Sequence, residues 1–257
     1  MWLGRFKNTV LDLFFPPHCV ACHRLGAWLC VDCLAAVERI QPPVCRRCGL
    51  PLSDPSMTTR SEVSRQWSIC DRCREMPFQL DGLLACAFHS DPLRQAIHQF
   101  KYEDLRSLAG LLGKLMAEGW VELAPADAGV DVLVPVPLHP TRQRQRGYNQ
   151  SDLLARELGA YLCRPVVTDV LVRTKPTAPQ VELNAQERRA NVRDAFRCTG
   201  ADLSGKRVLL VDDVCTTGST LESAGVALRE GGSASVWAYT LARARPSPTQ
   251  GADGYPS

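Results

Sequence analysis

Four C-x-x-C pairs constrain the fold of this chain more than any other feature of its sequence. Two residues between thiolates form a tight turn that points both sulfur atoms at one ion, and a tetrahedral Zn²⁺ needs two such turns. Four turns therefore predict two structural zinc sites, in segments too short to fold without a metal. The predicted ligands are Cys19, Cys22, Cys30, Cys33, Cys45, Cys48, Cys70 and Cys73.

Disulfides, a redox motif and an iron–sulfur cluster are the alternative uses of these cysteines. Disulfides belong to oxidising compartments, and no export signal is evident. A redox motif needs one pair beside a helix start rather than four pairs in series. Sequential pairing, first turn with second and third with fourth, is the simplest arrangement, and an interleaved one stays open. His18 and His23 flank the first pair, but the cysteines already fill both sites.

Hydropathy and charge bear on compartment and partners. No stretch approaches the roughly 18 apolar residues of a membrane span, and residues 1–17 read as a short amphipathic helix with Trp2, Phe6, Val10 and Leu13 on one face. We expect a cytoplasmic protein with no membrane span. Residues 1–80 carry ten Lys/Arg and seven Asp/Glu. Two Zn²⁺ bound by eight thiolates would add negative charge there, so Arg46, Arg47 and Arg72 are interpreted as local compensation rather than as a nucleic-acid patch.

Strand and helix patterns alternate through the rest of the chain, which favours an α/β fold with a parallel sheet. A helix is expected from Asp91, with Asp91 as its cap, Pro92 in its first turn and a break near Tyr102. Cys86, Cys163 and Cys198 are interpreted as packing residues, and residues 53–66 as a loop. Strands are expected at 82–89, within 131–140, at 206–214 and at 234–241, and further helices at 151–162 and 220–230.

The stretch VLLVDDVCTTGST, residues 208–220, carries the clearest chemical signal. Asp212 and Asp213 end a continuous apolar run, as at the carboxyl end of a central parallel strand, where ligands of open α/β sheets collect. A loop with Gly218 then leads into a helix start, whose free N–H groups and positive dipole suit a phosphate. The hydroxyls of Thr216, Thr217, Ser219 and Thr220 add donors. The acids suit neighbouring ribose hydroxyls or a Mg²⁺, so the stretch predicts a site for a ribose 5-phosphate.

Two other families share part of this stretch. Receiver domains also begin with VLLVDD, but only 44 residues follow Asp213 here, too few for the rest of that fold. A P-loop is excluded because no G-x-x-x-x-G-K-[ST] occurs. A buried strand that merely ends in acids would not explain TTGST.

Four apolar residues, DD, two spacers and TTGST resemble the PRPP-binding motif of type I phosphoribosyltransferases. The cysteine-rich N-terminus, Phe100-Lys101-Tyr102, VPVPLHP with RQRGYNQ, and Gln180 followed by ERRANVRDAF resemble the ComF family of competence-associated phosphoribosyltransferases. The resemblance implies the type I fold, a central parallel sheet with flanking helices and a hood. It also implies a division into a double zinc-ribbon domain at 1–80, a phosphoribosyltransferase domain at 81–243 and a disordered tail at 244–257.

The resemblance also implies roles for individual residues. Asp212 and Asp213 would contact the ribose diol, and Thr216, Thr217, Gly218, Ser219 and Thr220 would cradle the 5-phosphate. Pro137, Leu138 and His139 occupy the turn where such enzymes hold diphosphate. Arg142, Arg144 and Arg146 follow it, and either meet diphosphate charge or form a solvated basic loop. Arg188, Arg189 and Asn191 fall where the family has a mobile loop.

The expected reaction is transfer of phosphoribosyl from PRPP, with Mg²⁺, to a nitrogen acceptor that no segment identifies. The rival hypothesis is a protein that handles single-stranded DNA in natural transformation, with PRPP as a regulator or relic, and possible partners are the DNA itself or a competence helicase. The family resemblance and the Arg142–Arg146 cluster support it. Single-strand binding usually combines a basic groove with stacking aromatics, and aromatic residues make up only 7% of this chain, although Tyr148 is near the cluster. A third hypothesis is that the zinc ribbons bind a protein partner.

Overall fold

A four-stranded parallel sheet organises the computed structural model, which describes residues 16–52, 69–74, 79–103, 105–174, 195–200 and 202–245. The strand order is β1-β6-β5-β2, and every neighbouring pair is parallel. The strands are β1 (Gly82–Phe88), β2 (Val132–Pro135), β5 (Arg207–Cys215) and β6 (Ser235–Arg243). The predicted α/β class with a central parallel sheet is confirmed.

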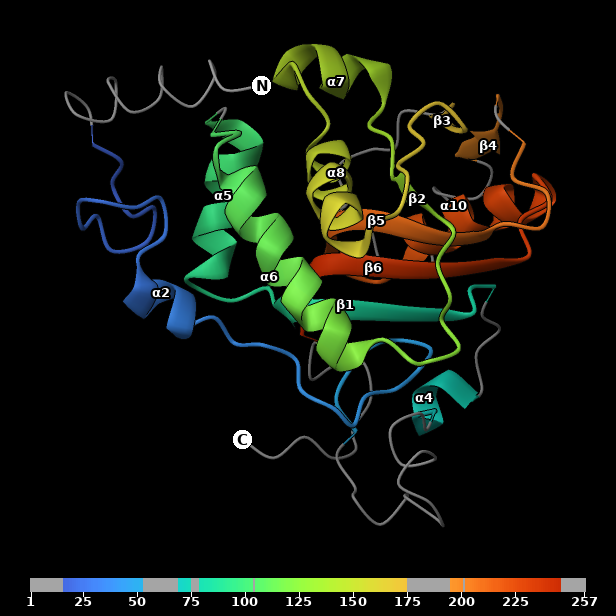
Figure 1. The fold of residues 1–257 in the computed structure, drawn as a ribbon, viewed down its shortest axis with the longest axis horizontal. Coiled ribbons are helices and arrows are strands. Elements are labelled where there is room, and N and C mark those ends of the chain that lie inside the picture. The colour runs from blue at the N-terminus through green and yellow to red at the C-terminus, as the bar shows by residue number, and fades with distance from the viewer. Residues whose placement is uncertain are drawn as a thin grey trace.

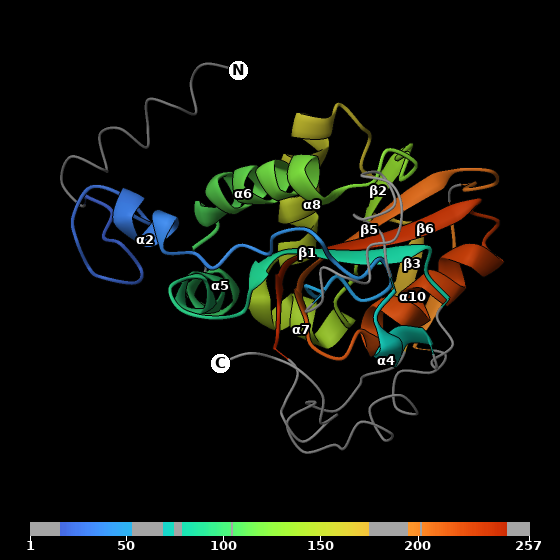
Figure 2. The same ribbon diagram turned by 90° about the horizontal axis from the view of Figure 1, so that it is seen from below.

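Helices cover both faces of this sheet (Figures 1 and 2). On one face lie α6 (Leu108–Leu123) and α8 (Gln150–Leu162), and on the other lies α10 (Ser219–Glu230). Leu209 and Val211 of β5 belong to the core under α6 and α8, whereas Val208 and Leu210 belong to the core under α10. This alternation follows from the two-residue period of a strand and explains why β5 reads as a continuous apolar run.

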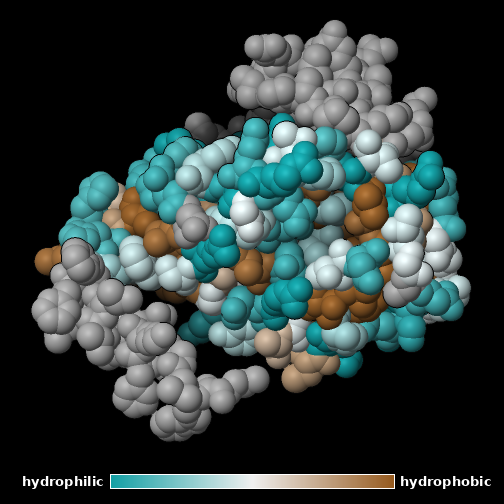
Figure 3. Space-filling model, turned by 90° about the horizontal axis from the view of Figure 1, so that it is seen from above, coloured by the Kyte–Doolittle hydropathy of each residue, from teal (hydrophilic) through white to brown (hydrophobic). Residues whose placement is uncertain are grey.

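Shorter elements complete the fold. A separate two-stranded antiparallel sheet is formed by β3 (Leu171–Arg173) and β4 (Phe196–Cys198). The helix α5 (Leu93–Tyr102) precedes α6, and α7 (Pro140–Arg146) follows β2, while α2 (Val31–Ala35) and α4 (Asp71–Arg74) lie in the cysteine-rich part. Seen from the side of α7, hydrophilic side chains cover most of the described surface and separate its hydrophobic patches (Figure 3).

Both edges of the main sheet are covered by other parts of the chain. Along β1, the Phe88 N–H donates to Glu38 O at 2.8 Å and the Ile40 N–H donates to Cys86 O at 3.0 Å. Along β2, Leu133 exchanges backbone hydrogen bonds with residues 165 and 167. Val37 and Ile40 share one hydrophobic core with β1, α5 and α6. The core thus continues across the predicted domain boundary at residue 80, and that boundary stays a prediction.

The predicted elements occur in the predicted order, with ends that differ by one or two residues, and α5 ends at Tyr102 where the break was expected. Two predictions are wrong. The Asp91 carboxylate does not cap α5, because the helix begins at Leu93 and the carboxylate binds the Arg94 guanidinium at 2.9 Å instead. Cys163 is exposed rather than packed, because it ends α8 in the left-handed conformation, with φ of 52°.

Several predictions lie outside the described residues. They are the amphipathic helix with Trp2, Phe6, Val10 and Leu13, the loop at 53–66, Gln180, the loop residues Arg188, Arg189 and Asn191, and most of the tail from 244 to 257. Among the described helices, none combines the length and apolar character that crossing a membrane requires.

Candidate functional site

The eight predicted ligand cysteines form two separate clusters. The first contains Cys19, Cys22, Cys30 and Cys33 and the second Cys45, Cys48, Cys70 and Cys73, with the sulfur atoms of each cluster within 4.8 Å of one another. The Cys22 and Cys30 sulfur atoms are 3.6 Å apart, and those of Cys48 and Cys70 are 3.9 Å apart. Zn–S bonds of about 2.3 Å place the corners of a tetrahedron about 3.8 Å apart. Both clusters therefore fit Zn²⁺, and sequential pairing is confirmed.

Backbone donors support both clusters in the same way. The Cys30 N–H points at Cys19 Sγ at 3.4 Å, and the Cys70 N–H points at Cys45 Sγ at 3.3 Å. Such hydrogen bonds stabilise thiolate charge and orient the ligands. The Arg46 guanidinium binds Asp127 at 3.0 Å and lies over the ring face of Trp237, and its predicted compensation of thiolate charge stays a prediction. Arg47 donates to Cys73 O at 2.7 Å.

The two acids predicted from the sequence lie at the carboxyl end of β5, beside the start of α8. Asp212 Oδ1 accepts hydrogen bonds from Ser151 Oγ at 2.7 Å and from the Asp213 N–H at 2.9 Å. Asn149 fixes the start of α8, because its side chain caps the Ser151 N–H and donates to Val136 O after β2. Burial, followed by the neighbouring Asp213, raises the pKa of Asp212 to about 7.

Asp213 is paired with a cation from a distant part of the chain. Lys101 Nζ at the end of α5 lies 2.7 Å from Asp213 Oδ1, and the Asp213 side chain is only 6% exposed. Asp213 Oδ2 is also buried and has no hydrogen-bond donor among the described residues. A buried carboxylate oxygen without a hydrogen-bond donor costs free energy, and a hydroxyl group of a ligand would supply the missing donor.

The loop after β5 leads directly into α10. Gly218 takes φ of 87° and occupies the cap position of α10 without a capping side chain, a conformation that glycine adopts at little cost. Thr216 and Thr217 are exposed, and the Thr217 and Ser219 hydroxyls lie 2.9 Å apart. The first turn of α10 and these neighbouring hydroxyls offer donors suited to an anion.

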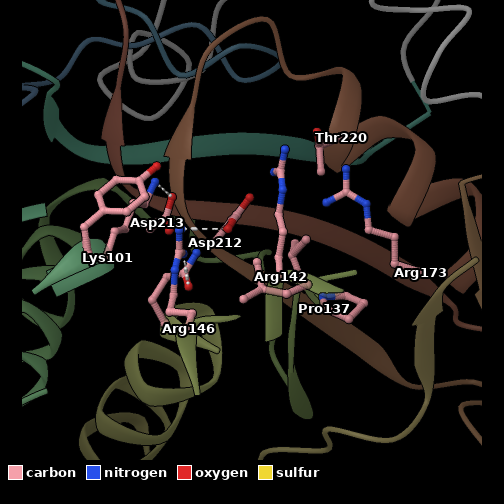
Figure 4. Close-up of a pocket in the computed structure, with 12 residues that line it drawn as sticks. Lys101, Pro137, Arg142, Arg146, Arg173, Asp212, Asp213 and Thr220 are labelled. Atoms are coloured by element: carbon pink, nitrogen blue, oxygen red, sulfur yellow. Dashed lines mark hydrogen bonds and ion pairs between the residues drawn. The ribbon is translucent and has the colours of Figure 1, made fainter. Parts of the chain in front are cut away.

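A cavity of about 170 Å³ opens beside the acids. Four cationic and two anionic side chains line it, so its net charge favours a polyanionic ligand. Lys101 lies beside Asp213, whereas Arg142 and Arg173 lie on the side of Thr220 (Figure 4). The Arg173 side chain comes from β3, and burial together with the nearby Arg142 lowers its pKa. The lining residues are Lys101, Tyr102, Val136, Pro137, Leu138, Arg142, Arg146, Gln150, Arg173, Asp212, Asp213 and Thr220.

The structure brings most of the predicted site residues together at this cavity, but not all of them. Both acids, Thr220, Pro137, Leu138 and Arg146 line it. The other predicted residues of the phosphate loop are not among the lining residues; they are Thr216, Thr217, Gly218 and Ser219. His139 caps α7 by accepting from the Thr141 N–H at 3.3 Å. Tyr148 is buried, with its hydroxyl on Phe100 O, and is unsuited to stacking. Tyr102 is 65% exposed at the cavity instead.

Sequence reasoning did not assign Lys101, Ser151 or Arg173 to the site. Lys101 lies within the Phe100-Lys101-Tyr102 segment, which was used for family resemblance but given no chemical role. Ser151 is the first residue of a predicted helix, and nothing in that position indicates a contact with an acid. Arg173 is the last residue of the short strand β3 and carries no local signal of its own. Contacts between residues far apart in sequence join all three to the acids or their cavity.

Comparison with protein families identifies both parts of the chain. Residues 10–74 match the double zinc ribbon domain, and residues 145–256 match the phosphoribosyl transferase domain. The second match contains both acids and the loop into α10. Together with the parallel sheet and the two Cys₄ clusters, these matches assign the described architecture to the type I phosphoribosyltransferase fold preceded by a double zinc ribbon.

Three curated relatives match over most of their length. The DNA utilization protein YhgH of Salmonella typhimurium is 32% identical over 85% of this chain and 92% of the relative. Competence protein F of Haemophilus influenzae is 31% identical over 90% of this chain and 99% of the relative. Competence protein ComFC of Bacillus subtilis is 27% identical over 84% of each.

Proposed function

Because this chain belongs to the ComF family and contains a phosphoribosyl transferase domain, we propose that it binds PRPP and transfers its phosphoribosyl group to a nitrogen acceptor. The observation that carries the proposal is the acid pair beside an electropositive cavity. Asp212 and Asp213 offer acceptors for two neighbouring hydroxyl groups, while four cations share the same cavity. PRPP presents this combination, a ribose diol between a monophosphate and a diphosphate.

The ribose diol would bind at the acids. Asp213 Oδ2 is the buried acceptor that lacks a donor among the described residues, and a ribose hydroxyl supplies one. Ser151 and Lys101 hold the two carboxylates in place, since each binds one acid at 2.7 Å. Ionised acids are the better acceptors for neutral hydroxyl groups. The lysine also reduces the repulsion between two adjacent carboxylates.

The 5-phosphate would bind at the loop from Thr216 to Thr220. The first N–H groups of an α-helix point along its axis, toward an anion that binds at the N-terminal end of the helix. Gly218 adopts a φ of 87°, which glycine reaches at little cost, and this conformation sets the direction of the helix start. Hydroxyl groups of Thr217, Ser219 and Thr220 add neutral donors that need no counterion.

The diphosphate would bind at the turn after β2, between Arg142 and Arg173. These two guanidinium groups lie on the same side of the cavity in Figure 4, and Arg142 contributes to the lowered pKa of Arg173. Like charges repel in the absence of a ligand, so a ligand with several negative charges relieves the repulsion. Pro137 and Leu138 form the wall of the same turn.

In the reaction, the acceptor nitrogen bonds to C1 of the ribose as the C1–O bond to diphosphate breaks. The diphosphate leaves with the bonding electron pair, and the acceptor nitrogen loses a proton. The arginines stabilise charge on the leaving group, and the acids orient the ring. Carboxylates are ligands that Mg²⁺ accepts, but Lys101 already neutralises Asp213, so Mg²⁺ would accompany the diphosphate and reduce its charge. Exposed Tyr102 is the surface on which a planar acceptor would stack.

Titration calorimetry with PRPP and Mg²⁺ tests the binding step. Arg142→Gln and Arg173→Gln are expected to weaken PRPP binding at least tenfold each, because each removes a charge-assisted contact of about 1.5–3 kcal/mol. Arg144→Gln is the matched control, since Arg144 lies on the same helix as Arg142 but does not line the cavity. Equal affinities for all three variants and the unmodified chain would contradict the proposed diphosphate site.

A screen of nitrogen bases and amines tests the transfer step. The purified protein is mixed with PRPP, Mg²⁺ and each acceptor, and release of diphosphate is measured. Release with one acceptor class identifies the substrate. PRPP binding without release, across the whole panel, would favour a regulatory role for the site. The proposed compartment is the cytoplasm, because eight thiols in two metal clusters require reducing conditions.

A second candidate function is the handling of single-stranded DNA, alone or with a competence helicase. The names of the relatives, which refer to DNA utilization and competence, support it. So do exposed Arg142 and Arg144 on α7 and exposed Tyr102, because single-strand binding combines cations with stacking aromatics. A gel-shift titration at increasing salt tests this candidate. Loss of binding in Arg144→Gln would support it, and no shift at low salt would exclude it.

A further inference from the structure

Residues 79–83 form a connecting segment that follows the second cysteine cluster in the chain and includes the first two residues of β1, and residues 79–81 run along α10. The Gln79 N–H donates to Glu222 Oε2 at 3.3 Å. Leu80 lies directly against Gly225, where an added Cβ would come within 2.2 Å of the leucine side chain. Asp81 forms an ion pair with Arg229. Residues 222, 225 and 229 are spaced three and four apart, so this connecting segment packs along one face of the helix.

The connecting segment is also attached to the second cluster itself. The Leu83 N–H donates to Arg46 O at 3.1 Å. Gly49 takes φ of 69° and lies so close to Leu83 O that a Cβ would come within 2.7 Å of it. The Arg46 guanidinium contacts the ring of Trp237 on β6. The turn between Cys45 and Cys48 is therefore fixed to β1 and β6 by its backbone and by a side chain.

Leu83 carries this attachment to the proposed phosphate loop. Its side chain is buried, and Cδ1 lies 3.8 Å from the place where a Cβ of Gly218 would be. Leu83 shares its core with Cys215 and Leu221, which flank the loop. Both cysteine clusters contact the other core, which includes α5 and α6, because Cys19 and Cys30 belong to it and Cys48 packs against it. Among the described residues, only the second cluster is also joined to Leu83, through Arg46 O and Gly49. The two clusters therefore differ in what they support.

We propose that metal in the second cluster positions the phosphate loop and the start of α10, whereas metal in the first cluster does not. Cys45, Cys48, Cys70 and Cys73 act through residues 79–83, which makes Leu80, Asp81 and Leu83 positioning residues for the anion site. Without the second metal, the turn at Cys45–Cys48 loses its fixed shape, and the connecting segment loses its anchor. The affinity part of this inference rests on the proposed function, while the positioning part does not.

Cys70→Ser and Cys30→Ser form a matched pair, because each cysteine is the third ligand of its cluster and has an N–H that donates to the first. Zinc content, hydrogen exchange of residues 216–225 and calorimetric titration with PRPP and Mg²⁺ are measured for both. Cys70→Ser is expected to raise exchange at 216–225 and to weaken PRPP binding about fivefold or more, the usual size of coupling between sites. Cys30→Ser is expected to lose one zinc and leave both properties within about twofold.

Asp81→Asn is the second variant, and it tests the proposed positioning even if Cys70→Ser does not fold. It removes the ion pair with Arg229 but leaves all eight ligands in place. Two zinc ions, faster exchange at 216–225 and weaker PRPP binding would support the proposal. Unchanged exchange in Asp81→Asn, or equal changes in Cys30→Ser and Cys70→Ser, would overturn it. Should the unmodified chain not bind PRPP, the proposed function fails, but the exchange measurements still test the positioning.

Discussion

Replacement of Lys101 by methionine tests how much the buried ion pair between Lys101 and Asp213 contributes to the stability of the protein. Lys101 Nζ lies 2.7 Å from Asp213 Oδ1, and the two side chains are 20% and 6% exposed. Removal of one partner from a buried pair costs about 3–5 kcal/mol, because the other charge stays buried. Water reaches part of Lys101, so we expect the lower end, a loss of about 3 kcal/mol in the free energy of unfolding.

A second substitution separates stability from binding. Lys101→Met with Asp213→Asn removes both charges, so we expect most of the lost stability to return. PRPP affinity is not expected to return, because the amide is a weaker acceptor for a ribose hydroxyl than the carboxylate. The double variant is expected to bind PRPP about tenfold or more weakly, from the roughly 1.5 kcal/mol by which a hydrogen bond to a charged acceptor is stronger.

Urea denaturation and calorimetric titration with PRPP measure the two effects. Lys114→Met is the control, since Lys114 pairs with Glu118 at 4.0 Å on the surface, and exposed pairs contribute less than about 1 kcal/mol. A loss in Lys101→Met no larger than in the control would refute the buried-pair argument. Affinity for PRPP in the double variant equal to that of the unmodified chain would refute the assignment of Asp213 to the ribose.

Three further outcomes are expected. PRPP affinity should rise about tenfold from pH 6 to pH 8, because the pKa of Asp212 is raised to about 7 and its ionised form accepts the hydroxyl groups. In calorimetric titrations, Asp212→Asn should not show this rise in affinity. Ser151→Ala removes a bond that lowers this pKa, so the rise should move to higher pH. Chelation of both zinc ions should lower the thermal midpoint in calorimetry, since metal binding contributes directly to folding of such ribbons; an unchanged midpoint would argue against structural zinc.

Local patterns predicted the central features of this fold. The C-x-x-C turns predicted the correct clusters, because one tetrahedral ion needs the four sulfur atoms of two such turns. The apolar run before Asp212 predicted a central strand because β5 is covered on both faces. The start of α10 was predicted within one residue, since Gly218 marks it. Each of these features depends on residues close together in sequence.

Such local patterns could not predict contacts between segments that are far apart in the sequence. Lys101 reaches Asp213 only because the end of α5 is brought to the end of β5 by the packing of the sheet and helices. The sequence places Arg46 beside Cys45 but does not show that its side chain binds Asp127. Strand order likewise depends on tertiary packing that no single segment encodes.

The covered edges of the main sheet restrict how other molecules can attach to it. An open edge strand invites a further strand from another chain, which leads to strand exchange or to fibrils. Here residues 38–40 occupy the outer side of β1, and residues 165–167 occupy that of β2. A partner protein or a second copy that meets this sheet must therefore recognise side chains and loops rather than extend its backbone ladder.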